Sequence, residues 1–138
     1  MIIGIAGYKG SGKDTVANVL QTSFLFEKRS FAQPIKDIIH NTFGIDKAIL
    51  SGDNGERIFR EESMPDWFYL SPRDMMQKIG MAFRDELHPD IWVKVMEKQI
   101  KSIKQNIVIP DVRFKNELDM VNKYGFCVGV HRPGYNGD

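Results

Sequence analysis

Cysteine, histidine and long apolar runs are scarce in this sequence, and each scarcity excludes a class of protein. The 138 residues include one cysteine, Cys127, so a disulfide framework within one chain is excluded, and its apolar neighbours predict a buried, inert thiol. The three histidines and the cysteine form no pattern of metal ligands. No apolar run reaches the length of a membrane span, and the first residues predict a core strand rather than a signal peptide. The formal net charge of +1 gives no reason to expect a nucleic-acid or membrane partner.

Length and composition are typical of one globular domain. A chain of 138 residues can bury its own core, and 42% hydrophobic and 27% charged residues are ordinary proportions for a soluble protein. We therefore expect a single domain over residues 1–138.

Apolar runs alternate with helical periodicities along the chain. We expect strands at residues 2–6, 27–31, 106–110 and 126–130. We expect helices at residues 13–23, 34–43, 72–87, 91–103 and 114–124. This alternation predicts an α/β fold of three layers, with a parallel sheet of about four strands flanked by helices. Residues 45–70 are the least regular part and predict an exposed arm with one short helix.

A glycine-rich turn follows the first predicted strand. It has the spacing G-x-x-x-x-G-K, from Gly7 to Lys13, between a strand and a helix, and this context gives the motif its meaning. Glycines let backbone N–H groups converge on phosphate oxygens, and the helix adds the positive end of its dipole. A turn that merely joins strand to helix is the alternative, which the match on both sides disfavours. The residues predicted to bind a nucleotide such as ATP are Gly7, Lys9, Gly10, Ser11, Gly12, Lys13, Asp14 and Thr15.

Two positions are candidates for holding Mg²⁺. Asp14 stands where a Ser or Thr commonly ligates the ion, and the hydroxyl comes one place later, at Thr15. Either Asp14 holds the ion, directly or through water, or Thr15 serves instead. Asp111 follows an apolar strand, and in parallel sheets ligands collect at the carboxyl ends of the strands, so we expect it beside the glycine loop. The alternative is that Asp111 only caps the helix that begins near Phe114.

A row of polar side chains lies along the predicted helix 72–87. Arg73, Gln77 and Arg84 share a face, where guanidinium groups suit phosphate oxygens and an amide suits a base edge. A solvated helix face is the alternative. Further candidates for binding a second substrate are Lys36, Arg57, Arg60, Trp67, Phe68, Tyr69 and Arg113. For the three aromatic residues, anchoring of the arm is an equal alternative.

Taken together, these segments resemble the deoxynucleoside monophosphate kinases of tailed bacteriophages. The matching stretches, in chain order, are residues 7–15, 31–36, 71–73, 77–80, 84–85, 89–92 and 111–117. The glycine loop is shared with many kinases, whereas the stretches from Arg73 to Trp92 and from Asp111 to Glu117 are more specific to this group.

The resemblance implies a P-loop kinase fold and transfer of phosphate from ATP, with Mg²⁺, to a deoxynucleoside monophosphate (dNMP). It implies a monophosphate site lined by Lys36, Arg73, Gln77, Arg84, Asp85 and Asp111. Lys13, Arg84 and Asp111 are the expected catalytic residues. Two alternatives stay open: another small-molecule kinase, of the dephospho-coenzyme-A or phosphomevalonate type, and a nucleotide-binding module without turnover.

The chain stops soon after its last predicted strand, where such kinases usually continue into further sheet, lid and helix. This predicts either a truncated product or a minimal form completed by a second copy in a homodimer. We expect a cytoplasmic protein, where ATP is available, with small-molecule substrates and neither nucleic acid nor membrane as a partner.

Overall fold

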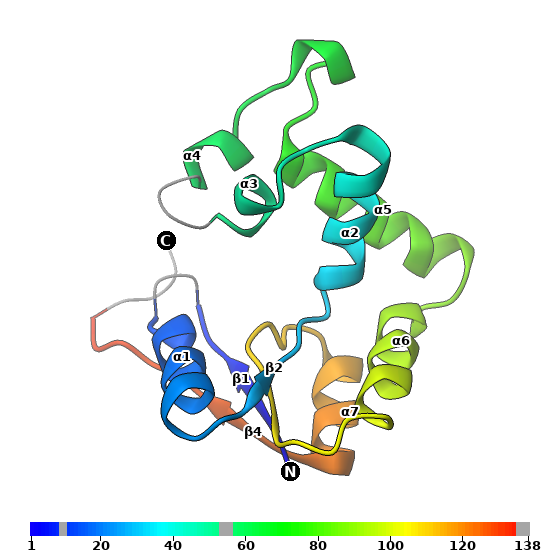
Figure 1. Ribbon diagram of the computed structural model, residues 1–138. Coiled ribbons are helices and arrows are strands. Elements are labelled where there is room, and N and C mark those ends of the chain that lie inside the picture. Colours follow the sequence, from blue (N-terminus) through cyan, green and yellow to red (C-terminus); the bar gives the residue numbers. More distant parts are fainter. Residues whose placement is uncertain (9–10, 53–56, 135–138) are drawn as a thin grey trace. The chain divides into compact units, whose positions relative to one another are not determined.

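Four strands form a sheet in the order β2-β3-β1-β4, and every neighbouring pair is parallel (Figure 1). The strands are β1 (Ile2–Ala6), β2 (Glu27–Lys28), β3 (Ile107–Ile109) and β4 (Gly125–Gly129). The computed structural model describes residues 1–8, 11–52 and 57–134. The prediction of an α/β fold with a parallel sheet of about four strands is confirmed.

Strand β2 is shorter than the predicted range of residues 27–31. The N–H of Arg29 still donates to Val108 of β3, at 3.0 Å. The N–H of Phe31 instead donates to the side chain of Asp111, at 3.0 Å, so the backbone has left the strand ladder by then. By Phe31, a side-chain acceptor has therefore replaced the backbone acceptors of β3.

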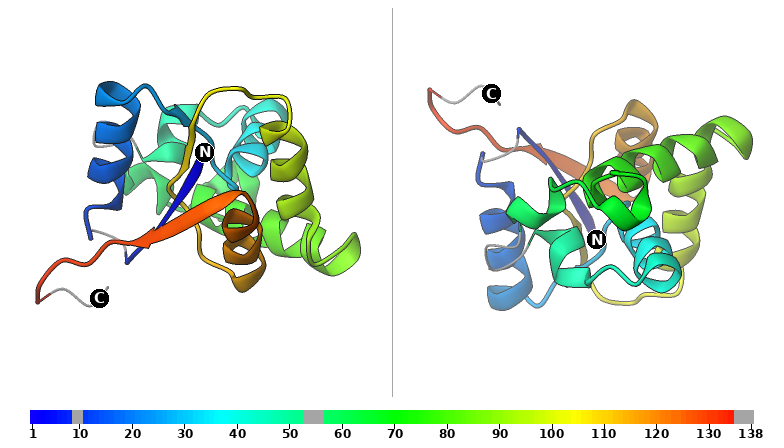
Figure 2. Two further views of the ribbon diagram at one scale, coloured as in Figure 1. Left: turned by 90° about the horizontal axis from the view of Figure 1, so that it is seen from below. Right: turned by 90° about the horizontal axis from the view of Figure 1, so that it is seen from above.

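The two faces of the sheet are covered by different helices (Figures 1 and 2). Because side chains alternate along a strand, one set of residues packs on α1 (Lys13–Ser23) and the other on α6 (Ile91–Ile100) and α7 (Lys115–Tyr124). The α1 face contains Ile3, Ile5, Ala17 and Val108. The opposite face contains Ile2, Met96, Ile107, Ile109, Met120 and Val121. Cys127 packs partly buried on this second face, and burial raises the pKa of its thiol.

The chain divides into two compact units. The sheet unit combines Met1–Phe31 with Trp92–Asp138, and the helical unit is Ala32–Ile91. The helical unit contains α2 (Gln33–Phe43), α3 (Lys47–Ser51), α4 (Arg57–Arg60), the 3₁₀ helix η1 (Pro65–Trp67) and α5 (Pro72–Glu86). Its buried apolar residues are Ile35, Ile39, Ile45, Leu50 and Met75.

The predicted arm, residues 45–70, has more helix than expected. We expected one short helix, whereas α3, α4 and η1 all lie within this range. The start of α3 is stabilised by Asp46, whose carboxylate accepts from the N–H of Ala48 at 2.8 Å. Its end is stabilised by Gly52, whose φ of 71° lies in the left-handed region. The caps at both ends therefore stabilise α3, although its apolar pattern is short.

Helix α5 begins as the sequence predicts. The hydroxyl of Ser71 accepts from the N–H of Asp74 at 3.0 Å, and the Asp74 carboxylate accepts from the N–H of Ser71 at 2.9 Å. This reciprocal capping box satisfies two backbone donors that a helix start otherwise leaves open.

Ala82 of α5 is exposed. On α6 the buried residues are Trp92, Val93, Met96 and Ile100, while Val95 is only partly buried. Among the described residues, no helix combines the length and apolar character needed to cross a membrane.

Candidate functional site

The glycine loop joins β1 to α1, and two of its glycines are required by geometry. Gly12 has a φ of 102°, in the left-handed region, and forms the N-terminal boundary of α1. A Cβ atom at Gly7 would lie 2.6 Å from the hydroxyl of Ser11 and 2.8 Å from the carbonyl oxygen of Val130. A larger residue at Gly7 would therefore displace the loop.

Ser11 is the most informative side chain of the loop. It is 7% exposed, and among the described residues its hydroxyl finds no hydrogen-bond partner. A buried polar group without a partner is costly, so the hydroxyl is poised to bond a ligand that enters the loop. Lys13, Asp14 and Thr15 follow at once in the first turn of α1, the positive end of the helix dipole. Two predicted loop residues lie outside the described part of the chain: Lys9 and Gly10.

The strand order brings Asp111 to the same edge of the sheet as this loop. Strands β1 and β3 are parallel neighbours, with Gly4 opposite Ile109, so the segments after them leave the same edge of the sheet. The chain after β1 continues into α1 on one face, and the chain after β3 continues into α7 on the other. Ligands of open parallel sheets bind at such a switch point.

The alternative prediction was that Asp111 caps α7, but the capping box of α7 uses Glu117, and Asp111 bonds the segment after β2. Its two carboxylate oxygens accept hydrogen bonds from the Ser30 hydroxyl, at 2.7 Å, and from the N–H of Phe31, at 3.0 Å. The capping role belongs to Glu117, a buried residue whose carboxylate accepts from the N–H groups of Arg113 and Phe114, at 2.8 and 3.0 Å.

The oxygen donors around the loop fit Mg²⁺. Asp14 and Thr15 are exposed at the start of α1, and Asp111 is partly buried. Within the described ranges, no group of three or more His, Cys, Asp and Glu side chains is arranged to hold a metal alone. Mg²⁺ is commonly bound by one or two carboxylates together with substrate phosphates and water, so this sparse donor set suits it.

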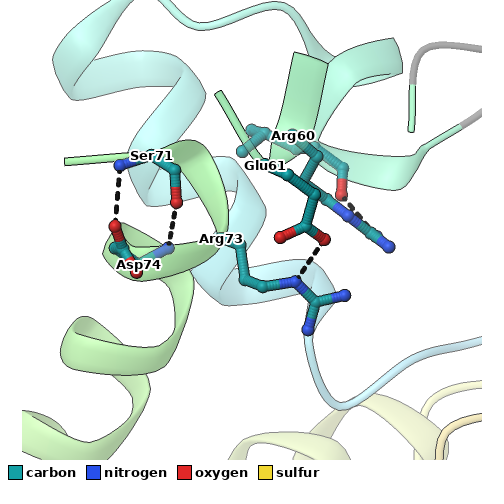
Figure 3. Close-up of polar contacts among 6 residues, drawn as sticks. Arg60, Glu61, Ser71, Arg73 and Asp74 are labelled. Atoms are coloured by element: carbon teal, nitrogen blue, oxygen red, sulfur yellow. Dashed lines mark hydrogen bonds and ion pairs between the residues drawn. The ribbon is translucent and has the colours of Figure 1, made fainter. Parts of the chain in front are cut away.

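The polar row on α5 lies in the helical unit. Arg73 forms an ion pair with Glu61, with 2.6 Å between Nε and Oε1 (Figure 3). Gln77 is exposed, and Arg84 is partly buried with its guanidinium beside Gly80. The predicted residue Asp85, next along the helix, is exposed.

The remaining predicted residues fall in different places. Trp67 contacts the ring of Phe43 edge-to-face, with 5.0 Å between ring centroids, so it anchors the arm to α2. Lys36 is partly buried on α2, and Arg113 is exposed in the sheet unit. The sheet unit thus contains the loop, Asp111 and Arg113. The helical unit contains Lys36, Trp67, Arg73, Gln77, Arg84 and Asp85.

Sequence reasoning missed two residues that contact the predicted site. Ser30 bonds Asp111, and its place just after β2, a neighbour of β3, was the signal that could have identified it. Glu61 pairs with Arg73, and its position in an irregular, highly charged stretch gave no such signal.

Known proteins similar to this chain are kinases of nucleotides and nucleosides. A sequence model of the family described as deoxynucleotide monophosphate kinase matches residues 1–64. A protein of Acanthamoeba polyphaga mimivirus, assigned as a deoxynucleotide monophosphate kinase, is 31% identical over 156 residues that cover 100% of this chain and 77% of the relative. The chain belongs to the deoxynucleotide monophosphate kinase family. The resemblance predicted from the sequence is confirmed.

Two further relatives of this chain have a lower identity to it, and the match covers less of each relative's length. The deoxynucleoside-5'-monophosphate kinase of Escherichia phage T5 is 23% identical over 180 residues, covering 89% of this chain and 72% of the relative. The uridine kinase of Clostridium novyi (strain NT) is 29% identical over 126 residues, covering 87% of this chain and 59% of the relative.

Proposed function

We propose that this kinase transfers the γ-phosphoryl group of ATP to a dNMP, giving ADP and the deoxynucleoside diphosphate. The observation that carries the proposal is the loop at the switch point of the sheet. There the buried Ser11 hydroxyl, the left-handed Gly12 and Lys13 follow β1, and Asp111 follows its parallel neighbour β3. Membership of the family supports a dNMP as the acceptor.

The loop residues bind the donor in this proposal. Backbone N–H groups at the start of α1 and the Ser11 hydroxyl donate to phosphate oxygens. Lys13 carries the cation that neutralises charge on the transferring group. Asp111, with Asp14 or Thr15, would hold Mg²⁺ directly or through water, and the bound ion would supply further positive charge at the phosphates.

The residues of the helical unit bind the acceptor. Arg73 and Arg84 hold the monophosphate, and the Gln77 amide can pair with a base edge because it offers both a donor and an acceptor. Lys36, Trp67, Asp85 and Arg113 are further candidates for the same substrate. An acceptor phosphate with a second pKa of about 6 is already ionised at neutral pH, so no strong general base is needed.

We propose that the two units function as one kinase domain, with residues 45–70 as its substrate-side arm. The small molecules involved are ATP, Mg²⁺ and one dNMP, and use of ATP supports a cytoplasmic location. Catalysis depends on positioning and charge rather than on a covalent step by the protein.

The test is a turnover assay with ATP, Mg²⁺ and each of the four dNMPs, in which the diphosphate product is detected directly. Direct detection separates phosphate transfer from simple ATP hydrolysis. Uridine, dephospho-coenzyme A and phosphomevalonate are offered in parallel as other acceptors. We expect a diphosphate from at least one dNMP. If none of the four yields one, the proposal is wrong, and calorimetric binding of a non-hydrolysable ATP analogue then identifies a binding module without turnover.

A further inference from the structure

Glu61 contacts the side chain of Arg73 in a specific way. The contact uses Nε, which lies 2.6 Å from Oε1 of Glu61, and the two Nη nitrogens are at the other end of the guanidinium (Figure 3). The two side chains are 32% and 46% exposed, for Arg73 and Glu61, so a ligand can still reach the pair.

Both partners start from backbone that is fixed by other contacts. The N–H of Glu61 donates to Ile58 at 3.2 Å and closes the end of α4. The neighbouring Arg60 donates from Nη1 to the carbonyl of Leu50 at 3.4 Å, which joins α4 to α3. Arg73 lies in the first turn of α5, inside the capping box. The ion pair therefore joins the fixed residue after α4 to the first turn of α5.

Stability alone is a weak reason for this contact. Exposed ion pairs contribute little to folding, because solvent screens them and two long side chains lose rotamer freedom. That loss of freedom is useful if Arg73 binds a ligand. An arginine that is already ordered loses less entropy on binding, and its Nη1 and Nη2 can form a fork with two phosphate oxygens.

We infer that Glu61 is a positioning residue for the acceptor phosphate: it holds Arg73 through Nε and presents Nη1 and Nη2 to the dNMP. The inference rests on the proposed function, since it requires Arg73 to bind the monophosphate. The competing idea predicts the opposite effect on dNMP binding when Glu61 is removed. If Glu61 occupied Arg73 in place of the phosphate, removing Glu61 would strengthen dNMP binding.

The first experiment compares Glu61→Ala with Glu62→Ala. Glu62 is the adjacent, exposed acid on the same arm and serves as the matched control. For the dNMP with the lowest KM, we expect Glu61→Ala to raise KM about tenfold, with the KM for ATP and kcat within about twofold of wild type. Glu62→Ala should match wild type. An unchanged or lowered KM for the dNMP in Glu61→Ala would overturn the inference.

The second experiment reverses the pair with Glu61→Arg and Arg73→Glu in one chain. This double variant restores opposite charges between α4 and α5 but removes the cation from α5. We expect the double variant to have a melting temperature within about a degree of that of wild type. Its KM for the dNMP should stay at least tenfold raised. Full recovery of that KM would show that the pair only ties the arm to α5.

Calorimetric titration of the dNMP keeps this inference separate from the proposed function. It measures the Kd without turnover. A wild-type chain that binds dNMP but forms no diphosphate contradicts the proposed function, and the Kd of Glu61→Ala still tests the inference. A wild-type chain that turns over, with equal Kd in both, contradicts the inference alone.

Discussion

The Ser30 hydroxyl donates a hydrogen bond to Asp111 over 2.7 Å, between the ends of two neighbouring parallel strands. The other carboxylate oxygen accepts from the N–H of Phe31, the last residue of the sheet unit before the chain enters the helical unit. The two hydrogen bonds thus orient the Asp111 carboxylate and also fix the segment that follows β2. An acid proposed to approach Mg²⁺ is held at the sheet edge rather than left free to rotate.

Ser30→Ala tests whether this orientation matters for turnover. Loss of one donor should lower the free energy of unfolding by about 0.5–1.5 kcal/mol and lower kcat for dNMP phosphorylation about three- to tenfold. Urea unfolding and steady-state kinetics measure the two effects. Ser102→Ala is the control, because its exposed hydroxyl donates to the nearby carbonyl of Gln99, at 2.9 Å, away from the strand ends. Wild-type kcat in Ser30→Ala would contradict a role for the contact.

The capping box of α5 makes a pH-dependent contribution to stability. Hydrogen bonds from the Ser71 backbone and then its hydroxyl lower the pKa of Asp74. A carboxyl with a lowered folded-state pKa stabilises the fold above its unfolded pKa, near 4, and this contribution is lost as the pH falls through the lower folded-state value. Asp74→Asn should therefore be less stable than wild type at pH 7, and the difference should shrink below about pH 4.

Melting temperatures of wild type and Asp74→Asn between pH 2.5 and pH 7 measure this effect. Ser71→Ala is the companion variant and should lose about 1 kcal/mol of stability, the usual value of a serine N-cap. A constant difference between wild type and Asp74→Asn across the pH range would show that the charge of Asp74 contributes nothing.

Lys13→Met tests the donor side of the proposed site. The substitution keeps much of the apolar stem and removes the cation proposed to face the transferring phosphoryl group. Turnover with any dNMP should fall at least about a hundredfold, in line with the electrostatic share of phosphoryl-transfer catalysis. The melting temperature should stay near that of wild type. Turnover equal to wild type would refute the assigned role.

Local signals made much of the fold predictable. The start of α1 follows from Gly12, whose lack of a Cβ permits the left-handed conformation, and the start of α5 follows from Ser71 and Pro72. The parallel direction of the strands follows less directly, from apolar runs that alternate with helices. Such features depend on residues within a few positions of each other, where pattern and physics coincide.

Contacts between distant residues could not be predicted in the same way. Ser30 and Asp111 are 81 positions apart, and only the pairing of β2 with β3 brings them together. Glu61 and Arg73 are 12 positions apart, in a stretch where many charged residues compete as partners. Sequence could therefore nominate Arg73 as an anion-binding residue but not the carboxylate that holds it.

Arg84→Ala separates the acceptor site from the donor site. Arg84 lies near the end of α5, in the helical unit, whereas the loop proposed to bind ATP belongs to the sheet unit. Losing a charge-assisted pair to the monophosphate should cost about 1.5–3 kcal/mol, roughly a ten- to hundredfold loss of dNMP affinity, with ATP-analogue affinity nearly unchanged. Lys78→Ala, at an exposed cation of the same helix, is the control and should leave both affinities unchanged.

Calorimetric titrations of both ligands, with a melting curve for each variant, distinguish three readings of Arg84. If Arg84 binds the monophosphate, only the dNMP affinity falls. If it belongs to a solvated face, neither affinity changes. If it is structural, which its partly buried position beside Gly80 makes a real alternative, the melting temperature falls together with both affinities. Loss of ATP-analogue binding with intact dNMP binding would mean that the two sites are assigned the wrong way round.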